Sequence, residues 1–198
     1  MDLEGEIQSL RDAGRLRDAA TKAVEGYGPE VLGFLVTILR DETSANEVFS
    51  QACEDLWQGL DRFEGRSSLR TWFYVLARHA AARFRRAPHR RPERRAGLSE
   101  VSGIAEHVRS RTLAHLRTEV KDGFAAIRNA LPEDDRALLV LRVDRKLSWN
   151  EIACVFSADG PPEETAPVAA KLRKRFERLI VELRERAREA GLVPQRED

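Results

Sequence analysis

The residues best suited to chemistry in this chain are aromatic rings and arginines that alternate between Asp61 and Arg86, in the run DRFEGRSSLRTWFYVLARHAAARFRR. Rings interleaved with guanidinium groups suit a single nucleic-acid strand, because rings stack on bases while arginines hold phosphates. The alternative is a solvated basic helix with a buried aromatic stripe. Taken alone, the run supports both interpretations about equally.

Residue types used in catalysis, phosphate binding and metal binding are present, but their spacing does not suit any of these functions. We find no nucleophile–base pair, no glycine-rich phosphate loop and no set of side chains with metal-ligand spacing. Cys53 and Cys154 lie far apart at apolar-periodic positions, which is typical of buried free thiols in a reducing compartment. The sequence therefore predicts a protein that is not an enzyme and needs no cofactor or metal.

Membrane and export signals are also missing from the sequence. The N-terminus, MDLEGEIQSL, is acidic and has no apolar segment of the kind that a signal peptide needs. The longest apolar run, Val31 to Leu39, is too short to span a bilayer. We expect a cytoplasmic protein without membrane insertion.

Charge is strongly segregated along the chain, although the net charge is only +1. From Arg62 to Arg95 there are eleven arginines and two glutamates, which gives 11 − 2 = +9. From Asp41 to Asp61 there are six acidic residues and no lysine or arginine, which gives −6. Such segregation indicates two different partner surfaces, or two segments that attract each other.

Apolar periodicity predicts an all-α fold of two small helical domains joined by a flexible linker. The first domain, 1–86, contains four helices, with a break at Gly26–Pro29 and Thr43 or Ser44 capping the third helix. Residues 87–111 are rich in proline, glycine and arginine, and we expect a linker there with at most a short helix near its end. Its arginines either solubilise the chain or follow a nucleic-acid backbone.

The second domain, 112–198, is expected to contain a helix-turn-helix. Helical periodicity covers residues 112–131, and Pro132 begins the next helix. Ser148 and Glu151 have the spacing of a capping box ahead of a short helix, 149–156. A long basic helix from about residue 163 or 165 to 190 follows, so that its first turns can enter a major groove. An ordinary helical hairpin is the alternative.

These residues together resemble the extracytoplasmic-function (ECF) group of bacterial RNA polymerase sigma factors, in the sigma-70 family. The resemblance spans about Gly14 to Arg186. It is most specific in the run LDRFEGRSSLRTW, from Leu60 to Trp72, and continues through Ala77-Arg78-His79-Ala80. LPE at Leu131 and LSWNEIA at Leu147 resemble the start of the family's second domain.

The resemblance implies a function in transcription initiation: binding core RNA polymerase, recognising the −10 and −35 promoter elements, and promoting DNA melting. The implied partners are core RNA polymerase and promoter DNA, both as duplex and as melted strand. It also implies the roles of individual residues. Core polymerase binding falls on Asn46, Glu47, Phe49, Ser50, Gln51 and Asp55. Contact with −10 DNA falls on Arg62, Phe63, Ser67, Ser68, Arg70, Thr71, Trp72, Tyr74, Arg78, His79 and Arg83. Contact with −35 DNA falls on Thr165, Lys171, Arg173, Lys174, Arg175 and Arg178.

Two departures from the family pattern are visible. Asn46, Ser50 and Gln51 replace positions with more acidic or glutamine character, and the segment from Ser157 to Glu164 is about one helical turn longer than usual. The family also makes an anti-sigma partner a fair expectation. The competing hypothesis is a stand-alone helix-turn-helix regulator that binds duplex DNA without polymerase, which leaves the aromatic–arginine run unexplained.

Overall fold

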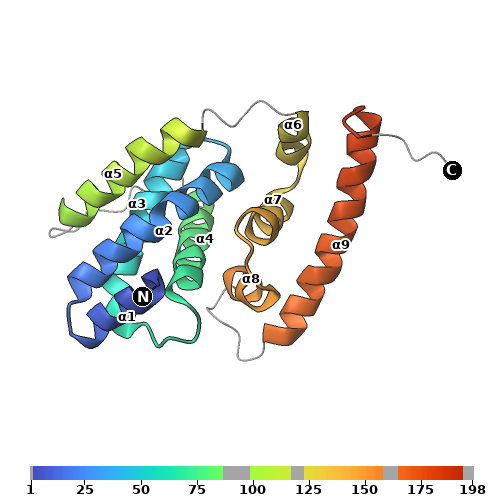
Figure 1. The fold of residues 1–198 in the computed structure, drawn as a ribbon. Helices are drawn as coiled ribbons and strands as arrows, with labels where there is room; N and C mark the ends of the chain where they lie inside the picture. The colour runs from blue at the N-terminus through green and yellow to red at the C-terminus, as the bar shows by residue number, and fades with distance from the viewer. Residues whose placement is uncertain (1, 87–98, 117–122, 158–164, 194–198) are drawn as a thin grey trace.

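A computed structural model of the chain describes residues 2–86, 99–116, 123–157 and 165–193. In these ranges the chain forms helices and no strand, which confirms the predicted all-α class. Helices α1–α5 form one group, and α6–α9 form a second group beside it, with α4 facing α7 and α8 (Figure 1). The helix bounds are α1 Leu3–Asp12, α2 Leu16–Leu39, α3 Glu42–Gly59, α4 Leu69–Arg86, α5 Ser99–Leu116, α6 Gly123–Ala130, α7 Glu133–Leu139, α8 Trp149–Phe156 and α9 Thr165–Glu189.

Helix α2 is continuous through Gly26–Pro29, so the predicted break there is wrong. An internal proline costs a helix about 3 kcal/mol. Eleven residues of α2 are buried, and each large aliphatic side chain among them contributes roughly 1.5–3 kcal/mol, which outweighs that cost. The glycines serve close packing instead. A Cβ on Gly28 would lie 3.1 Å from Val108 of α5 and 3.2 Å from Phe49 of α3.

Helices α3 and α4 complete the first group. Asp41, rather than the expected Thr43 or Ser44, caps α3 by accepting a hydrogen bond from the Ser44 N–H at 2.6 Å. A short 3₁₀ turn, Leu60–Arg62, and an irregular segment connect α3 to α4. Phe49 and Phe73 meet in the core between these two helices.

Helix α5 occupies Ser99–Leu116, where the sequence led us to expect mostly linker. Its Ala105 and Val108 are 1% and 4% exposed because they pack against α2 and α3. The first part of the expected linker, 87–98, lies outside the described residues. The division of the chain into 1–86, 87–111 and 112–198 stays a prediction.

The second group contains the expected helix-turn-helix elements. Ser148 accepts a hydrogen bond from the Glu151 N–H, and the Glu151 carboxylate accepts one from the Ser148 N–H, which confirms the predicted capping box. Between α7 and α8 the chain makes a π-helical turn, Val140–Asp144. The long segment from 158 to 164 lies outside the described residues, as do residues 117–122 of the helix expected over 112–131.

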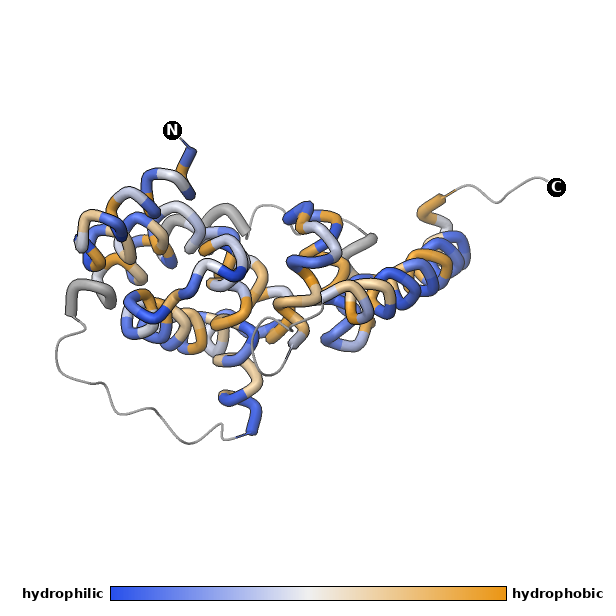
Figure 2. Tube along the Cα trace, turned by 90° about the horizontal axis from the view of Figure 1, so that it is seen from below, coloured by the Kyte–Doolittle hydropathy of each residue, from blue (hydrophilic) through white to orange (hydrophobic). Residues whose placement is uncertain are grey.

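Apolar residues gather between the helices, and the polar ones lie outside, as the hydropathy colouring shows (Figure 2). One cluster of buried side chains runs through both groups and includes Phe34 and Leu138. A smaller cluster, centred on Leu131, Leu139 and Leu179, joins α7 to α9. Among the described residues, no helix combines the length and apolarity that crossing a membrane requires.

Candidate nucleic-acid interface

The segment 63–68, which we call the base loop, forms one wall of a pocket of about 230 Å³. The pocket brings together four residues predicted to contact −10 DNA, namely Arg62, Phe63, Ser67 and Trp72. Trp72 lies parallel to Phe63, with ring centroids 4.8 Å apart and an interplanar angle of 28°. A Cβ on Gly59 would come within 3.1 Å of the Trp72 ring, so glycine permits this close approach. The pocket therefore has an aromatic wall next to guanidinium groups.

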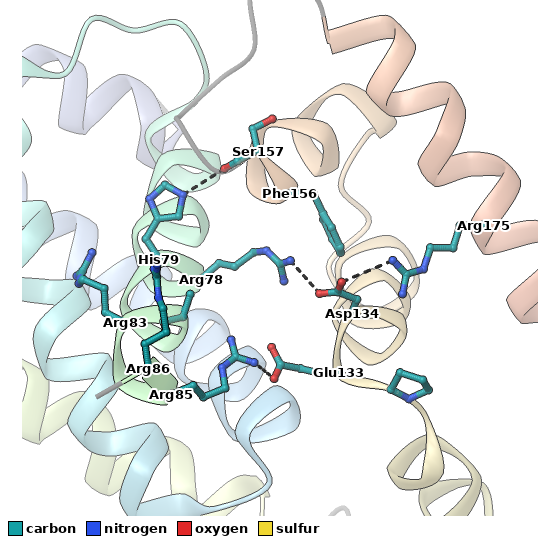
Figure 3. Close-up of a pocket in the computed structure, with 12 residues that line it drawn as sticks. Arg78, His79, Arg83, Arg85, Arg86, Glu133, Asp134, Phe156, Ser157 and Arg175 are labelled. Carbon is teal, nitrogen blue, oxygen red and sulfur yellow. Dashed lines mark hydrogen bonds and ion pairs between the residues drawn. The ribbon is translucent and has the colours of Figure 1, made fainter. Parts of the chain in front are cut away.

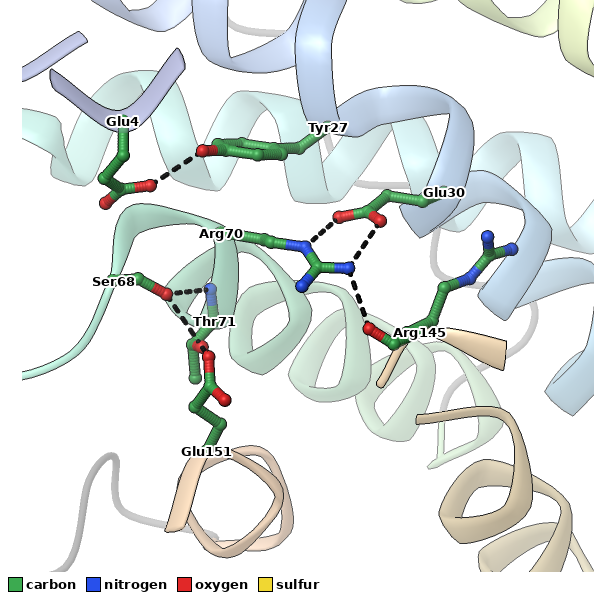
Figure 4. Close-up of polar contacts among 8 residues, drawn as sticks. All are labelled: Glu4, Tyr27, Glu30, Ser68, Arg70, Thr71, Arg145 and Glu151. Atoms are coloured by element: carbon green, nitrogen blue, oxygen red, sulfur yellow. Dashed lines mark hydrogen bonds and ion pairs between the residues drawn. The ribbon is translucent and has the colours of Figure 1, made fainter. Parts of the chain in front are cut away.

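The first turn of α4 is fixed by a small network (Figure 4). The Ser68 Oγ accepts a hydrogen bond from the Thr71 N–H at 3.1 Å. The Thr71 hydroxyl donates to the Glu151 carboxylate of α8, also at 3.1 Å. Burial raises the pKa of Glu151, but the hydrogen bonds from Ser148 and Thr71 outweigh this, and the net shift is downward. Thr71 is 0% exposed, so in this structure it does not face solvent.

Arg70 and Tyr74, also predicted to contact −10 DNA, point inward. The Arg70 guanidinium binds both carboxylate oxygens of Glu30, at 2.6 and 2.8 Å, and donates to the Arg145 carbonyl at 3.1 Å. The hydrogen bonds that Arg70 donates to Glu30 raise the pKa of Arg70. Tyr74 is 0% exposed and packs edge-on against Phe34, with centroids 5.4 Å apart. Neither side chain is free to reach a DNA strand in this arrangement.

A second pocket, of about 670 Å³, lies between α4 and the second group of helices (Figure 3). Arg78 donates to Asp134 at 2.8 Å, and its guanidinium lies 4.2 Å from the centroid of the Phe156 ring. Arg85 forms an ion pair with Glu133, and the His79 ring nitrogen lies 3.2 Å from the Ser157 carbonyl. These contacts come from α4 on one side and from α7 and α8 on the other.

The Asp134 carboxylate is the acidic group that two arginines share in this second pocket. Burial raises the pKa of its carboxyl, but the hydrogen bond and charge of Arg78 and the charge of Arg175 lower it by more. Arg175 of α9 lies 3.6 Å from Asp134 and donates to Asp135 at 2.7 Å. Two arginines predicted to bind different DNA elements thus meet on one carboxylate.

The residues predicted to bind polymerase lie on α3 in different degrees of exposure. Glu47 is exposed, Phe49 is 0% exposed and belongs to the core, and Asn46, Ser50, Gln51 and Asp55 are half-buried. Arg109 of α5 donates to the Ser50 hydroxyl at 2.6 Å. Arg83, predicted to contact −10 DNA, forms an ion pair with Asp55, so the basic and acidic segments do attract each other.

The residues predicted to contact −35 DNA are more exposed to solvent than those predicted to contact −10 DNA or core polymerase. Lys171, Arg173, Lys174 and Arg178 are exposed on α9, while Thr165 and Arg175 are half-buried. Trp149 of α8 packs edge-on against Phe176 of α9, with ring centroids 5.5 Å apart. The first half of α9 therefore exposes a basic face to solvent, while its apolar residues pack against α8.

The sequence did not indicate several residues that contact these sites. Glu4 of α1 reaches the start of α4, and Arg11 reaches the base loop. Glu133 and Asp134 of α7 reach α4. All four contacts join residues that are far apart in the sequence. Periodicity reports which face of a helix is apolar and gives no partner for a polar side chain. Cys53 and Cys154 are both free and buried, as expected, and burial raises the pKa of each thiol.

Comparison with known proteins agrees with this arrangement. Residues 23–91, which contain α3, the base loop and α4, match the family described as Sigma-70 region 2. The RNA polymerase sigma-H factor of Pseudomonas aeruginosa is 31% identical over 135 residues, which cover 65% of this chain and 70% of that protein. A loop-and-helix pair with an aromatic pocket, a separate basic helix-turn-helix face and these two similarities lead to one conclusion: the chain belongs to the sigma-70 family of promoter-recognising RNA polymerase sigma factors.

Proposed function

We propose that this chain is an ECF-group sigma factor that holds an unpaired base of the −10 element in the pocket between the base loop and Trp72. The run LDRFEGRSSLRTW, Leu60 to Trp72, which lies inside the residues 23–91 that match Sigma-70 region 2, supports the ECF assignment. The stacked Phe63 and Trp72 rings beside Arg62 support the base pocket, since capture of an unpaired base costs a few kcal/mol of unstacking that ring stacking and phosphate contacts offset.

The partners of this function would use separate surfaces. Core RNA polymerase would bind the outer face of α3, where Glu47 is exposed. Duplex DNA of the −35 element would lie against Lys171, Arg173, Lys174 and Arg178, whose charges suit phosphates and guanine edges. An anti-sigma protein would act by covering one of these surfaces. The chain would bind core polymerase and promoter DNA and separate the DNA strands, and it would catalyse no chemical step of its own.

In-vitro transcription with core polymerase tests the proposal. Transcripts made from genomic fragments should begin at a fixed distance from a shared pair of upstream sequences, and only when the chain is present. A double variant, Phe63→Ala with Trp72→Ala, should still bind core polymerase but lose these transcripts. Tight binding to duplex DNA without any complex with core polymerase would instead support a stand-alone regulator.

A further inference from the structure

Helix α1 contacts both ends of the base loop, although it lies outside the residues that match Sigma-70 region 2. At one end, the Glu4 carboxylate accepts a hydrogen bond from the Leu69 N–H at 2.5 Å. Leu69 begins α4, and its N–H has no partner inside the helix. A carboxylate at this position also interacts favourably with the helix dipole. Glu4 therefore fixes where α4 starts.

The Glu4 carboxylate is itself held in place. Its second oxygen accepts a hydrogen bond from the Tyr27 hydroxyl of α2 at 2.8 Å. Burial and the hydrogen bond to Glu4 raise the pKa of Tyr27, so the hydroxyl stays protonated and continues to donate. Ile7, 1% exposed, anchors the same helix in the core.

At the other end of the base loop, Arg11 holds Phe63. Its Nη2 donates to the Phe63 carbonyl at 2.6 Å, and its guanidinium lies 4.8 Å from the centroid of the Phe63 ring. The same ring stacks on Trp72, and both rings line the pocket. Arg11 thus contacts the pocket through Phe63.

We infer that Arg11 is a positioning residue for base recognition: with Glu4, it presets the shape of the base loop before DNA arrives. This inference rests on the proposed function of the pocket. Binding a preformed pocket avoids the cost of ordering a loop at the moment of binding, and that cost otherwise reduces affinity and selectivity. Loss of Arg11 should therefore reduce selectivity for the captured base more than overall affinity.

The test uses the full chain in complex with core polymerase. Short single-stranded DNA of random sequence is selected by binding, and the preference at each position is read by sequencing. Wild type should show one strongly preferred position, and Arg11→Ala should weaken that preference about tenfold, the scale of losing a charged hydrogen bond. Arg11→Lys should also weaken it, because an ammonium group lacks the planar fork that both stacks and donates.

The matched control is Arg17→Ala, which removes the same charge from an exposed position on α2. Its selected sequences should keep the wild-type preference, with at most a uniform loss of affinity. Melting temperatures identify any variant that fails to fold. An unchanged preference in a folded Arg11→Ala variant overturns the inference, whereas a flat profile for wild type itself counts against the proposed function.

Discussion

Replacing Trp72 by alanine is the most direct perturbation of the proposed base pocket. The change removes the ring that stacks on Phe63 at 4.8 Å and leaves Phe63 as the remaining ring in the pocket lining. Stacking of one base on an aromatic side chain contributes about 1–3 kcal/mol. At 1.4 kcal/mol per factor of ten, the population of opened promoter should fall roughly 5- to 150-fold. Affinity for core polymerase should be unchanged, because the polymerase-binding residues predicted on α3 are not altered.

The variant will also lose stability, and this effect must be separated from the loss of stacking. A stacked aromatic pair contributes about 0.5–1.5 kcal/mol beyond its buried area. Trp72→Phe keeps a ring against Phe63 and should recover much of the opening. Trp57→Ala removes a half-buried indole on α3 that does not line the pocket, and it should leave opening unchanged.

Permanganate oxidation of unpaired thymines, in complexes of equal occupancy, measures the opening. Titration of labelled core polymerase measures the docking. Equal thymine reactivity in the wild-type and Trp72→Ala complexes, at equal occupancy, would refute the role of this ring. A parallel fall in reactivity and in core affinity would show instead that the variant is poorly folded.

Three other outcomes are expected. Arg173→Ala should weaken duplex binding at the upstream element and lower the salt slope by about one, while Arg184→Ala, further along the same helix, should not; footprinting at several salt concentrations checks both. Gly28→Ala should lower the melting temperature, because the new Cβ meets Val108 at 3.1 Å and Phe49 at 3.2 Å and overpacking costs about 1–3 kcal/mol; Val108→Ala should then cost less in the Gly28→Ala background than in wild type. The ion pairs of Asp134 lower its pKa, so their contribution to stability is fully present above its unfolded pKa of about 4 and is lost as the pH falls through the lowered value. The stability difference between wild type and Asp134→Asn, from denaturant titration, should be constant near neutral pH and shrink in acid.

Sequence reasoning predicted the elements well where local signals and burial agree. The capping box at Ser148 and Glu151 and the free buried thiols were both confirmed. It failed at Gly26–Pro29, where two glycines and a proline lie inside α2. Those glycines make room for Leu3 and Val108, and close packing of this kind depends on residues far away in sequence. Periodicity within one segment contains no such information.

The same limit explains Tyr74. Its spacing places it with Arg70 and Arg78, on the polar side of the predicted helix, and this led us to expect a surface for DNA. In the structure α4 is covered by α2 and also by α8, so that its polar side is buried as well and Tyr74 packs on Phe34. In sequence, a helix that packs on two faces looks the same as an amphipathic helix that packs on one face and exposes the other. Whether Tyr74 ever contacts DNA stays a prediction.

Four of the eleven residues predicted to contact −10 DNA lie together in the structure. Arg62, Phe63, Ser67 and Trp72 line one pocket because a short 3₁₀ turn and the base loop return the chain to the start of α4. The pairing of Arg78 with Asp134 was out of reach, because it joins two segments that no local pattern connects.

The hydrogen bonds from Arg136 to the end of α2 have a consequence for spectroscopy. Arg136 of α7 donates to the Thr37 and Ile38 carbonyls at 3.2 and 2.9 Å, so each carbonyl would bind water instead if this contact were broken. Their stretching vibrations, shifted out of the main amide band by carbon-13 labelling, would differ between these two environments. Two backbone carbonyls can therefore report whether the contact between α2 and α7 is made, without a dye or a substituted side chain.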